Sequence, residues 1–358
     1  MIHLASPIIG EDEIAAVNRV LRSGQIAQGS EVAALETEFA AEMDAGHAVA
    51  VANGTLALLL ALQAIDLEHG DEVIVPSFTF AATANAVVMA GGTPVFADIE
   101  GSSFCIDPES AAAMISERTR AIIAVHLYGH MAPMRPLADL ANAHGIRLIE
   151  DAAQAHGARR DDLPVGALSD LATYSFYPTK NMTTGEGGMV TARDPELARA
   201  VALLRNHGME RRYHHDRVGM NARLTDIAAA IGRVQLTRLD GWNERRRQIA
   251  AIYDLHLAGV VDVPRAAPGV RHVYHQYTIR TERRDEVASV CETAGIGYGI
   301  YYPIPCHQQL AFAEYRTDPP LPETERAAKE VLSIPIRPDL TDREVEQVVD
   351  AIAVGVKT

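Results

Sequence analysis

The sequence has few cysteines and no long run of apolar residues. Its three cysteines, Cys105, Cys291 and Cys306, are odd in number and far apart, so they suit neither a disulfide framework nor a zinc site. No apolar run approaches the roughly 20 residues that cross a membrane, and residues 1–7 lack the basic and then apolar pattern of a secretion signal. We therefore expect a cytoplasmic protein with no membrane segment.

Basic residues are scarce relative to acidic ones. Lysine and arginine total 32 against 47 aspartates and glutamates, which gives a formal net charge of −15. No basic cluster could follow a phosphate backbone, which argues against nucleic acid as a partner. No Gly-x-Gly-x-x-Gly motif follows the first expected strand, which argues against a nicotinamide cofactor. An anionic ligand would need a local site, such as a helix N-terminus or a few arginines.

The sequence does contain a regular alternation of short apolar strands and helices. The 358 residues, 48% of them hydrophobic, suffice for a large core and exceed one typical domain. Helices are expected at 11–22, 31–43, 56–65, 81–90, 108–115, 134–144 and 195–205, and strands at 48–52, 72–76, 94–98, 121–127 and 147–151. This alternation predicts an α/β fold with a largely parallel sheet. We expect a large domain at 1–240, a small α/β domain at 241–358, and a linking helix at about 224–258.

Three of the expected strands end in polar or aromatic residues, and parallel sheets bind ligands at such ends. Asn53-Gly54-Thr55 follows a strand and opens a helix, either as a phosphate site or as an ordinary helix cap. Asp151 closes another strand, where a buried carboxylate needs a cation such as a protonated pyridine nitrogen; alternatively it caps a short helix. Phe80 follows a third strand and lies either on a cofactor ring or in the core.

Lys180 is the candidate nucleophile. It lies within residues 174–190, after an aromatic strand that Pro178 ends and before a glycine-rich stretch and a second apolar run. A lysine in a partly desolvated pocket has a lowered pKa and can attack a carbonyl to form a Schiff base, as pyridoxal phosphate enzymes require. A solvated loop lysine is the ordinary alternative.

Two further segments stand out. Residues 209–217 are polar and rich in histidine and are expected to form a loop; they show no recognised ligand spacing, so no metal is expected. Residues 301–307, Tyr-Tyr-Pro-Ile-Pro-Cys-His, are expected to form a rigid aromatic loop. Cys306 and His307 are adjacent, but neighbours in sequence usually point in different directions, which argues against a nucleophile pair.

Taken in order, these segments resemble the DegT/DnrJ/EryC1/StrS family of pyridoxal phosphate-dependent sugar aminotransferases over essentially the whole chain. The resemblance is carried by Asn-Gly-Thr at 53–55, Pro-Ser-Phe-Thr-Phe at 76–80, Val-His-Leu-Tyr-Gly at 125–129, Glu-Asp-Ala-Ala-Gln-Ala-His-Gly at 150–157, Ser-Phe-Tyr-Pro-Thr-Lys-Asn at 175–181, Gly-Glu-Gly-Gly at 185–188, Arg-Asn-His-Gly at 205–208, and Tyr-Tyr-Pro-Ile-Pro with His307 at 301–307. One such motif is weak, whereas this many in one order are highly specific.

The resemblance implies an aspartate aminotransferase-like (type I) fold, pyridoxal 5'-phosphate as cofactor, and a homodimer whose subunits share active sites. It implies that Lys180 carries the cofactor, that Asp151 pairs with the pyridine nitrogen, and that Gln154 lies near the 3-hydroxyl group with Phe80 stacked on the ring. The residues implied for the cofactor phosphate are Gly54, Thr55, Ser175 and, from the neighbouring subunit, Asn221. Family members that dehydrate sugars carry histidine in place of Lys180, so the lysine implies an aminotransferase.

The resemblance also implies glutamate or glutamine as amino donor and a nucleotide-linked keto-sugar as acceptor. We expect a 4-keto-6-deoxyhexose, because residues 183–187 look more like members acting at C4; the alternatives are a C3-keto-sugar and a keto-inositol of antibiotic biosynthesis. Another alternative is a regulatory protein that binds the cofactor but does not catalyse a reaction. The presence of Lys180, Asp151 and Asn221 argues against it. Four side chains either face the sugar or its diphosphate or are simply packed or solvated: Tyr213, Arg223, Tyr302 and His307.

Overall fold

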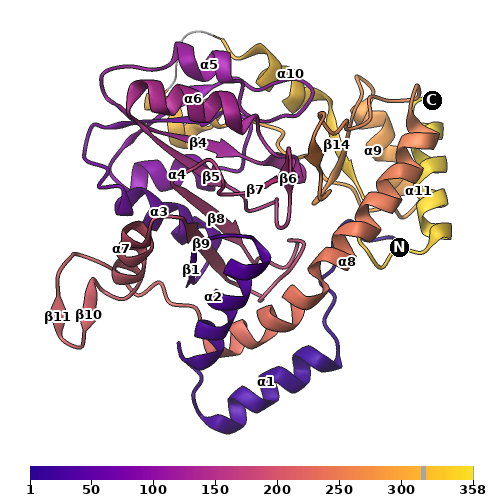
Figure 1. Cartoon of the computed structure of the whole chain (residues 1–358). Helices are drawn as coiled ribbons and strands as arrows, with labels where there is room; N and C mark the ends of the chain where they lie inside the picture. Colours follow the sequence, from indigo (N-terminus) through magenta and orange to yellow (C-terminus); the bar gives the residue numbers. More distant parts are fainter. Residues whose placement is uncertain (316–319, 358) are drawn as a thin grey trace.

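The computed structural model describes residues 1–315 and 320–357 and is built around a seven-stranded sheet (Figure 1). The strands lie in the order β1 (His47–Val51), β9 (Gly188–Ala192), β8 (Leu171–Ser175), β5 (Arg147–Asp151), β4 (Thr119–Val125), β2 (Glu72–Pro76) and β3 (Thr93–Ala97). Neighbouring strands are parallel except for β9, which is antiparallel to both β1 and β8. The predicted α/β fold with a largely parallel sheet is confirmed.

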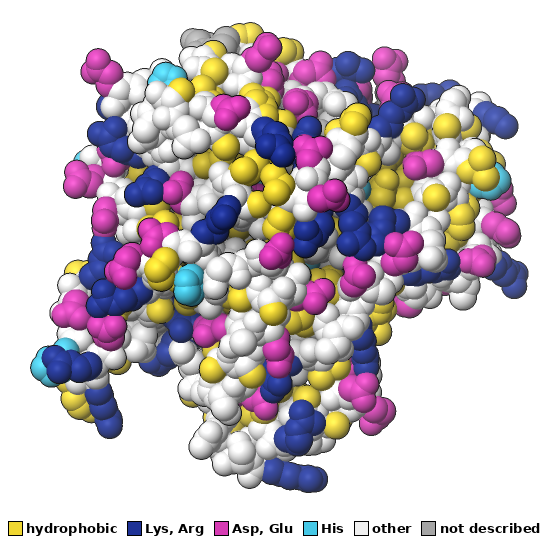
Figure 2. Space-filling view, in the orientation of Figure 1, with side chains coloured by type: hydrophobic (Ala, Val, Ile, Leu, Met, Phe, Trp, Pro, Cys, Tyr) yellow, Lys and Arg dark blue, Asp and Glu magenta, His cyan; other side chains and the backbone are white. Residues whose placement is uncertain are grey.

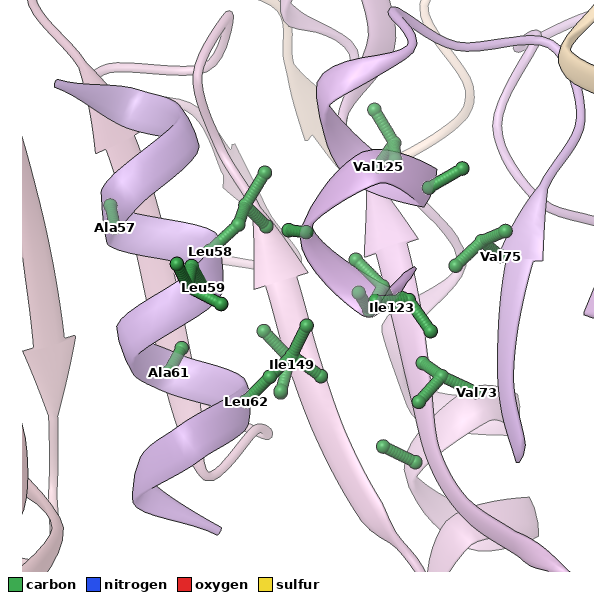
Figure 3. Close-up of a cluster of buried hydrophobic side chains, with 14 of the residues drawn as sticks. Ala57, Leu58, Leu59, Ala61, Leu62, Val73, Val75, Ile123, Val125 and Ile149 are labelled. Atoms are coloured by element: carbon green, nitrogen blue, oxygen red, sulfur yellow. The ribbon is translucent and has the colours of Figure 1, made fainter. Parts of the chain in front are cut away.

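The central strands are buried on both faces, because their alternate residues belong to two different apolar clusters. In β2, Val73 and Val75 belong to the first cluster, whereas Ile74 belongs to the second. Figure 3 shows the first cluster, where α3 (Gly54–Ala64) lies along the strands and directs Leu58 and Leu62 toward them. Near-continuous apolar strands are therefore explained by two covering layers.

Helices from different parts of the chain form these two layers. The layer over the first cluster contains α3, α4 (Ala82–Met89), α7 (Pro195–Arg205) and α10 (Pro322–Glu330). The layer over the second cluster contains α2 (Ser30–Glu42), α5 (Pro108–Ala113), α6 (Met134–His144) and the first half of α8 (Asp226–Leu257). The expected helix at about 224–258 is α8, which Thr225 caps by accepting a hydrogen bond from the backbone of Ala228.

A third apolar cluster lies at the C-terminal end of α8 (Figure 1). It is formed by the second half of α8, the two-stranded sheet of β13 (Tyr277–Arg280) and β14 (Val331–Ile334), and the helices α9 (Arg284–Thr293) and α11 (Asp342–Gly355). Ile2 also belongs to it, and α1 (Glu11–Ser23) packs along α8. Cys306, Phe312 and Leu321 return to the first cluster. The domain boundary at residue 240 stays a prediction.

The structure adds detail where the sequence predicts loops. Residues 209–217, expected as a loop, contain an antiparallel pair, β10 (Met209–Arg211) and β11 (His214–His215), because the backbone pairs with itself although its side chains are exposed. The remaining short elements are β6 (Arg159–Arg160), β7 (Leu163–Pro164), β12 (Val270–Arg271), η1 (Leu127–Gly129), η2 (Cys306–Gln308) and η3 (Leu310–Tyr315). Within residues 1–315 and 320–357, no helix is long and apolar enough to cross a membrane.

Candidate active site

The carboxyl ends of β1, β2, β4, β5 and β8 open into one cavity of about 950 Å³. The N-terminus of α3 and the segment after β2 form one side of it. Residues from the C-terminal third of the chain, including His275, Tyr301 and Tyr302, close the other side. Parallel sheets bind ligands at the carboxyl ends of their strands. The cavity therefore lies where the sequence analysis expects a ligand to bind.

Lys180 lies in this cavity on the connection between the antiparallel strands β8 and β9. The connection is held at several points: the backbone N–H of Lys180 donates to Tyr177 O at 2.9 Å, and both Thr183 Oγ1 and the Thr184 N–H donate to Phe176 O, at 2.8 and 3.0 Å. Because its backbone is fixed in this way, the lysine amine projects from a rigid turn. A rigid element positions a reactive group more accurately than a mobile loop.

The amine of Lys180 and the carboxylate of Asp151 influence each other across the cavity. Burial lowers the pKa of Lys180 to about 8, while the charge of Asp151 opposes that shift. Asp151 is 6% exposed, and its burial raises its pKa despite hydrogen bonds from Thr83 Oγ1 at 2.8 Å and the Ala153 N–H at 3.2 Å. A carboxylate so placed is stabilised by a nearby cation, and an amine so placed is a competent nucleophile and base near neutral pH.

The start of α3 lies against the end of β8. Gly188 of β9 pairs with both Val51 and Ser175, and a Cβ on Gly188 would come within 2.7 Å of Asn53 backbone atoms. A Cβ on Gly54 would come within 2.7 Å of Ser175 Cβ. The two glycines therefore let the helix N-terminus and the serine hydroxyl approach closely. Backbone N–H groups at a helix N-terminus and hydroxyl groups form a phosphate-binding site.

Gln154, Tyr302 and Phe80 form the remaining wall. Gln154 Oε1 accepts a hydrogen bond from the Tyr128 N–H at 2.6 Å, and Gln154 Nε2 donates to the Tyr302 hydroxyl at 3.3 Å. The rings of Phe80 and Tyr302 lie 6.0 Å apart between centroids, and Phe80 is 60% exposed. An aromatic ring so exposed at a cavity is available to lie against a planar ligand.

The structure brings most of the expected site residues together, but four of them lie elsewhere in this chain. The cavity is lined by Gly54, Thr55, Phe80, Asp151, Gln154, Ser175, Lys180 and Tyr302. Asn221 and Tyr213 are exposed away from it, and Arg223 donates to Asn206 Oδ1 at 2.8 Å. His307 Nδ1 lies 2.6 Å from Ser77 Oγ, so His307 anchors the 301–307 segment beside β2.

Sequence reasoning missed several residues of the site. Thr83, which holds Asp151, and Glu186, His275 and Tyr301 all line the cavity or contact its groups. Thr83 and Glu186 lie within quoted or neighbouring motifs and could have been found there. His275 belongs to none of the motifs found in the sequence, and only the fold brings it to the cavity.

These side chains fit pyridoxal 5'-phosphate. The closely approached helix N-terminus of α3 with Ser175 suits its phosphate, the buried Asp151 suits its cationic ring nitrogen, and the Lys180 amine suits its aldehyde carbon. Within the described residues, no group of three or more His, Cys, Asp or Glu side chains could hold a metal ion.

The fold and the site together define a pyridoxal phosphate-dependent aminotransferase. Over residues 7–353 the chain matches the model of the DegT/DnrJ/EryC1/StrS aminotransferase family, and it belongs to that family. The family resemblance inferred from the motifs is thus confirmed. The predicted enzyme class, sugar aminotransferase, is confirmed as well.

Several named proteins are similar in sequence to this chain over nearly their full length. The "Pleiotropic regulatory protein" of Geobacillus stearothermophilus is 44% identical over 344 residues, which cover 94% of this chain and 92% of that protein. The dTDP-3-amino-3,4,6-trideoxy-alpha-D-glucose transaminase of Streptomyces venezuelae is 44% identical, over 94% of this chain and 90% of that one. The UDP-N-acetyl-3-dehydro-alpha-D-glucosamine 3-aminotransferase of Acidithiobacillus ferrooxidans is 42% identical, over 95% and 93%.

Solved structures of related proteins have the same fold over most of this chain. The structure of DesV from S. venezuelae matches with a TM-score of 0.94 and 43% identity, over 97% of this chain and 94% of that chain. The structure of NtdA from Bacillus subtilis, solved with bound pyridoxamine phosphate, matches with a TM-score of 0.91 and 30% identity, over 98% and 83%. The predicted aminotransferase fold and the predicted cofactor are therefore confirmed.

Proposed function

We propose that this protein transfers an amino group from glutamate or glutamine to a keto-sugar carried on a nucleotide. The observation that carries the proposal is the Lys180 amine, whose pKa is lowered to about 8 in a cavity that also holds a buried carboxylate and a helix N-terminus. Relatives that are 42–44% identical are named for amino groups on nucleotide-linked sugars, which supports the same acceptor class here.

Each cavity residue has a role in this proposal. Lys180 would hold the cofactor covalently between turnovers, and Asp151 would pair with its ring nitrogen. When bound, pyridoxal phosphate withdraws electrons from the donor's α-carbon and so makes its proton acidic. Lys180 Nζ, whose pKa burial lowers to about 8, would be the general base that takes this proton and carries it from the donor's α-carbon to the cofactor. In the second half-reaction Lys180 Nζ would move a proton in the opposite direction, toward the carbon of the keto-sugar that receives the amino group.

The remaining residues bind and orient. Gly54, Thr55 and Ser175 would hold the phosphate, Phe80 would cover one face of the ring, and Gln154, which Tyr128 and Tyr302 hold in place, would bind the 3-hydroxyl group.

The charge of the cavity supports a site completed by a second copy of the chain. Of the described residues that line it, Lys180 is the only lysine or arginine, against the carboxylates of Asp151 and Glu186. Yet a cofactor phosphate, a donor carboxylate and a sugar diphosphate must all be held. Exposed cations gather on the β10–β11 hairpin, which projects at the lower left of Figure 2 and carries Arg211 and Arg212. We propose a homodimer in which this region and Asn221 reach the partner's cavity.

Mixing two inactive variants tests this shared site. Lys180→Ala and Asn221→Ala chains that carry different affinity tags are unfolded and refolded together, and purification on both tags in turn isolates the mixed dimer. If Asn221 serves the partner's cavity, each mixed dimer keeps one intact site and activity returns. If no activity returns although mixed dimers form, Asn221 does not act across the interface.

The position of the keto group is a finer proposal. The names of the relatives in S. venezuelae and A. ferrooxidans place the transferred amino group at C3, which supports a 3-keto-sugar as substrate. The resemblance of residues 183–187 to members acting at C4 favours a 4-keto-6-deoxyhexose instead, and keto-inositol is the alternative without a nucleotide. Both nucleotide-linked candidates require a site for a diphosphate, whereas keto-inositol does not.

An absorbance spectrum tests the whole proposal. The purified protein with pyridoxal phosphate should be yellow, glutamate or glutamine should bleach it, and one acceptor among 3-keto and 4-keto nucleotide sugars and keto-inositol should restore the colour. A protein that never turns yellow would remove Lys180 from the centre of the mechanism. A protein that bleaches but is restored by keto-inositol alone would overturn the nucleotide-sugar acceptor.

A further inference from the structure

A buried amide in the middle of α8, that of Asn243, contacts two of the segments that form the cavity. Its Nδ2 donates a hydrogen bond to His156 O at 2.9 Å, and its Oδ1 accepts one from Asn181 Nδ2 at 2.7 Å. Asn243 and Asn181 are 2% and 3% exposed, and both lie outside the set of residues that line the cavity. The helix therefore connects the segment that follows β5 with the turn that follows β8.

The orientation of both amides is fixed by backbone carbonyls, which only accept hydrogen bonds. Because His156 O is such a carbonyl, Asn243 presents its nitrogen to it and its oxygen to Asn181. Asn181 Nδ2 also donates to Val273 O at 3.0 Å, so the position of its nitrogen is assigned independently of Asn243. An amide at position 243 thus satisfies a donor on one side and an acceptor on the other.

The turn that follows β8 carries the amine. Asn181 directly follows Lys180, and their side chains diverge, because that of Lys180 lines the cavity and that of Asn181 reaches α8. The same helix contacts this turn at a second point, where Gln235 Oε1 accepts a hydrogen bond from the Thr183 N–H at 3.4 Å. Gln235 and Asn243 are eight residues apart, which places them on one face of the helix. This face of α8 therefore supports the turn on both sides of residue 182.

The segment that follows β5 carries the carboxylate. It runs from Asp151, the last residue of the strand, through Gln154 to His156. Within it the Ala155 N–H donates to Ala152 O at 2.9 Å, which closes a tight turn. Asp151 and Gln154 line the cavity, whereas the carbonyl of His156 faces α8. A hydrogen bond to that carbonyl therefore holds the segment from the side opposite the cavity.

We infer that Asn243 is a positioning residue for Lys180: by hydrogen bonding to both segments, it fixes the lysine relative to Asp151 and Gln154. The inference rests on the proposed function in taking Lys180 as the amine that bonds to the cofactor. Asp151 and Gln154 would hold the cofactor ring, so the amine has to meet the aldehyde carbon at one place. A displacement of about 1 Å in such a geometry can cost about 100-fold in reactivity.

Two forms of the cofactor separate the position of Lys180 from the integrity of the cavity. Pyridoxal phosphate forms a covalent bond with the lysine, whereas pyridoxamine phosphate depends on the other cavity groups alone. The ratio of the two affinities, each measured by titration of the cofactor-free protein, therefore reports how well the amine is placed. Lys180→Ala gives the value of this ratio without any contribution from the lysine.

Asn243→Leu nearly keeps the volume of the side chain and removes both hydrogen bonds. Its affinity for pyridoxal phosphate should fall by about 10- to 100-fold, with little change in its affinity for pyridoxamine phosphate, so the ratio moves toward that of Lys180→Ala. A melting curve shows whether the variant is folded. If it is not, Asn243→Ser, whose side chain is too short to reach both partners, is measured with the same expectation.

Ile249→Ala is the matched control for a loss of stability. Ile249 is a fully buried residue of the same helix, and it belongs to the third apolar cluster, whose described members all lie outside residues 151–190. Truncation of a buried isoleucine lowers the melting temperature, as the loss of buried hydrogen bonds at Asn243 also does. The ratio of the two affinities should nevertheless keep its wild-type value in this control.

The outcomes distinguish the two roles. A wild-type ratio in the folded Asn243 variant would overturn the positioning role and leave Asn243 a purely structural residue. An equal fall of the ratio in Ile249→Ala would overturn it as well, because lost stability alone would then explain the effect. A wild-type protein whose ratio does not differ from that of Lys180→Ala would instead overturn the role of Lys180 in the proposed function.

Discussion

Adding one methyl group at Gly54 is a direct perturbation of the proposed phosphate site. In Gly54→Ala the new Cβ would lie 2.7 Å from Ser175 Cβ and 3.3 Å from Ser175 Cα. Both atoms are fixed to the backbone of β8, so a rotamer change cannot relieve the contact. Overpacking of this kind costs about 1–3 kcal/mol, and alanine in a helix recovers less than about 1 kcal/mol of that. We expect a net loss of about 1–2 kcal/mol in unfolding free energy.

The effect on cofactor binding should be larger than the effect on stability. If the helix start moves away from Ser175, the phosphate loses at least one charge-assisted hydrogen bond, which contributes about 1.5–3 kcal/mol. That loss corresponds to roughly 10- to 100-fold weaker binding. Titration with pyridoxamine phosphate, which forms no covalent bond to Lys180, measures this affinity, and urea unfolding of the cofactor-free protein measures stability.

Gly241 in α8 provides the matched control. A Cβ there meets nothing within 4 Å, so Gly241→Ala should raise the unfolding free energy by about 0.5–1 kcal/mol and leave cofactor affinity unchanged. Wild-type affinity in Gly54→Ala would refute the assignment of this helix start to the phosphate, whatever its stability.

Other predictions follow from single residues. Lys180→Ala should lose transamination and the yellow colour yet still bind pyridoxamine phosphate, which calorimetry checks; turnover in this variant would contradict the mechanism. Burial lowers the pKa of Lys180 from 10.5 to about 8. Between pH 8 and 10.5 the unfolded chain therefore binds more protons than the folded chain. The free energy of unfolding of the cofactor-free protein should accordingly rise with pH over this range. Lys180→Met should show a smaller rise in urea midpoint between pH 8 and 10, and an equal rise would count against the shift. In Gly232→Ala a Cβ would lie 2.8 Å from Thr184 Cγ2 and 3.1 Å from Leu35 Cδ2, so the unfolding free energy should fall by about 1–3 kcal/mol, in contrast to the control on the same helix.

The part of the site that the sequence predicts is the part that lies at strand ends. Asp151 and Asn53-Gly54-Thr55 each follow an apolar run, and the ends of parallel strands meet at one edge of a sheet, so their convergence follows from the pattern. Lys180 is found in the same way, between two runs.

The residues that the sequence does not reveal depend on contacts between distant segments. His275 contacts Asn181, which lies 94 residues earlier in the sequence, and no local sequence pattern predicts that contact. For His307 the sequence leaves a sugar contact and a packed position open, and only the structure shows its contact with Ser77, because the direction of a side chain in an irregular loop is set by its packing. The hairpin at β10 and β11 depends on backbone pairing that its polar side chains do not indicate.

The antiparallel strand β9 also has a consequence for folding. The amine of Lys180, the hydroxyl of Ser175 and the glycine that admits the start of α3 all belong to one β8–β9 hairpin, in which Ser175 pairs with Gly188. Residues 176–187 are the only chain between the two strands, a shorter connection than those between the parallel neighbours around it, so the hairpin should assemble sooner than the parallel pairings. The chemically reactive centre is thus a local unit that can be ordered before the sheet is complete, and its amide hydrogens should gain protection from exchange as a single group.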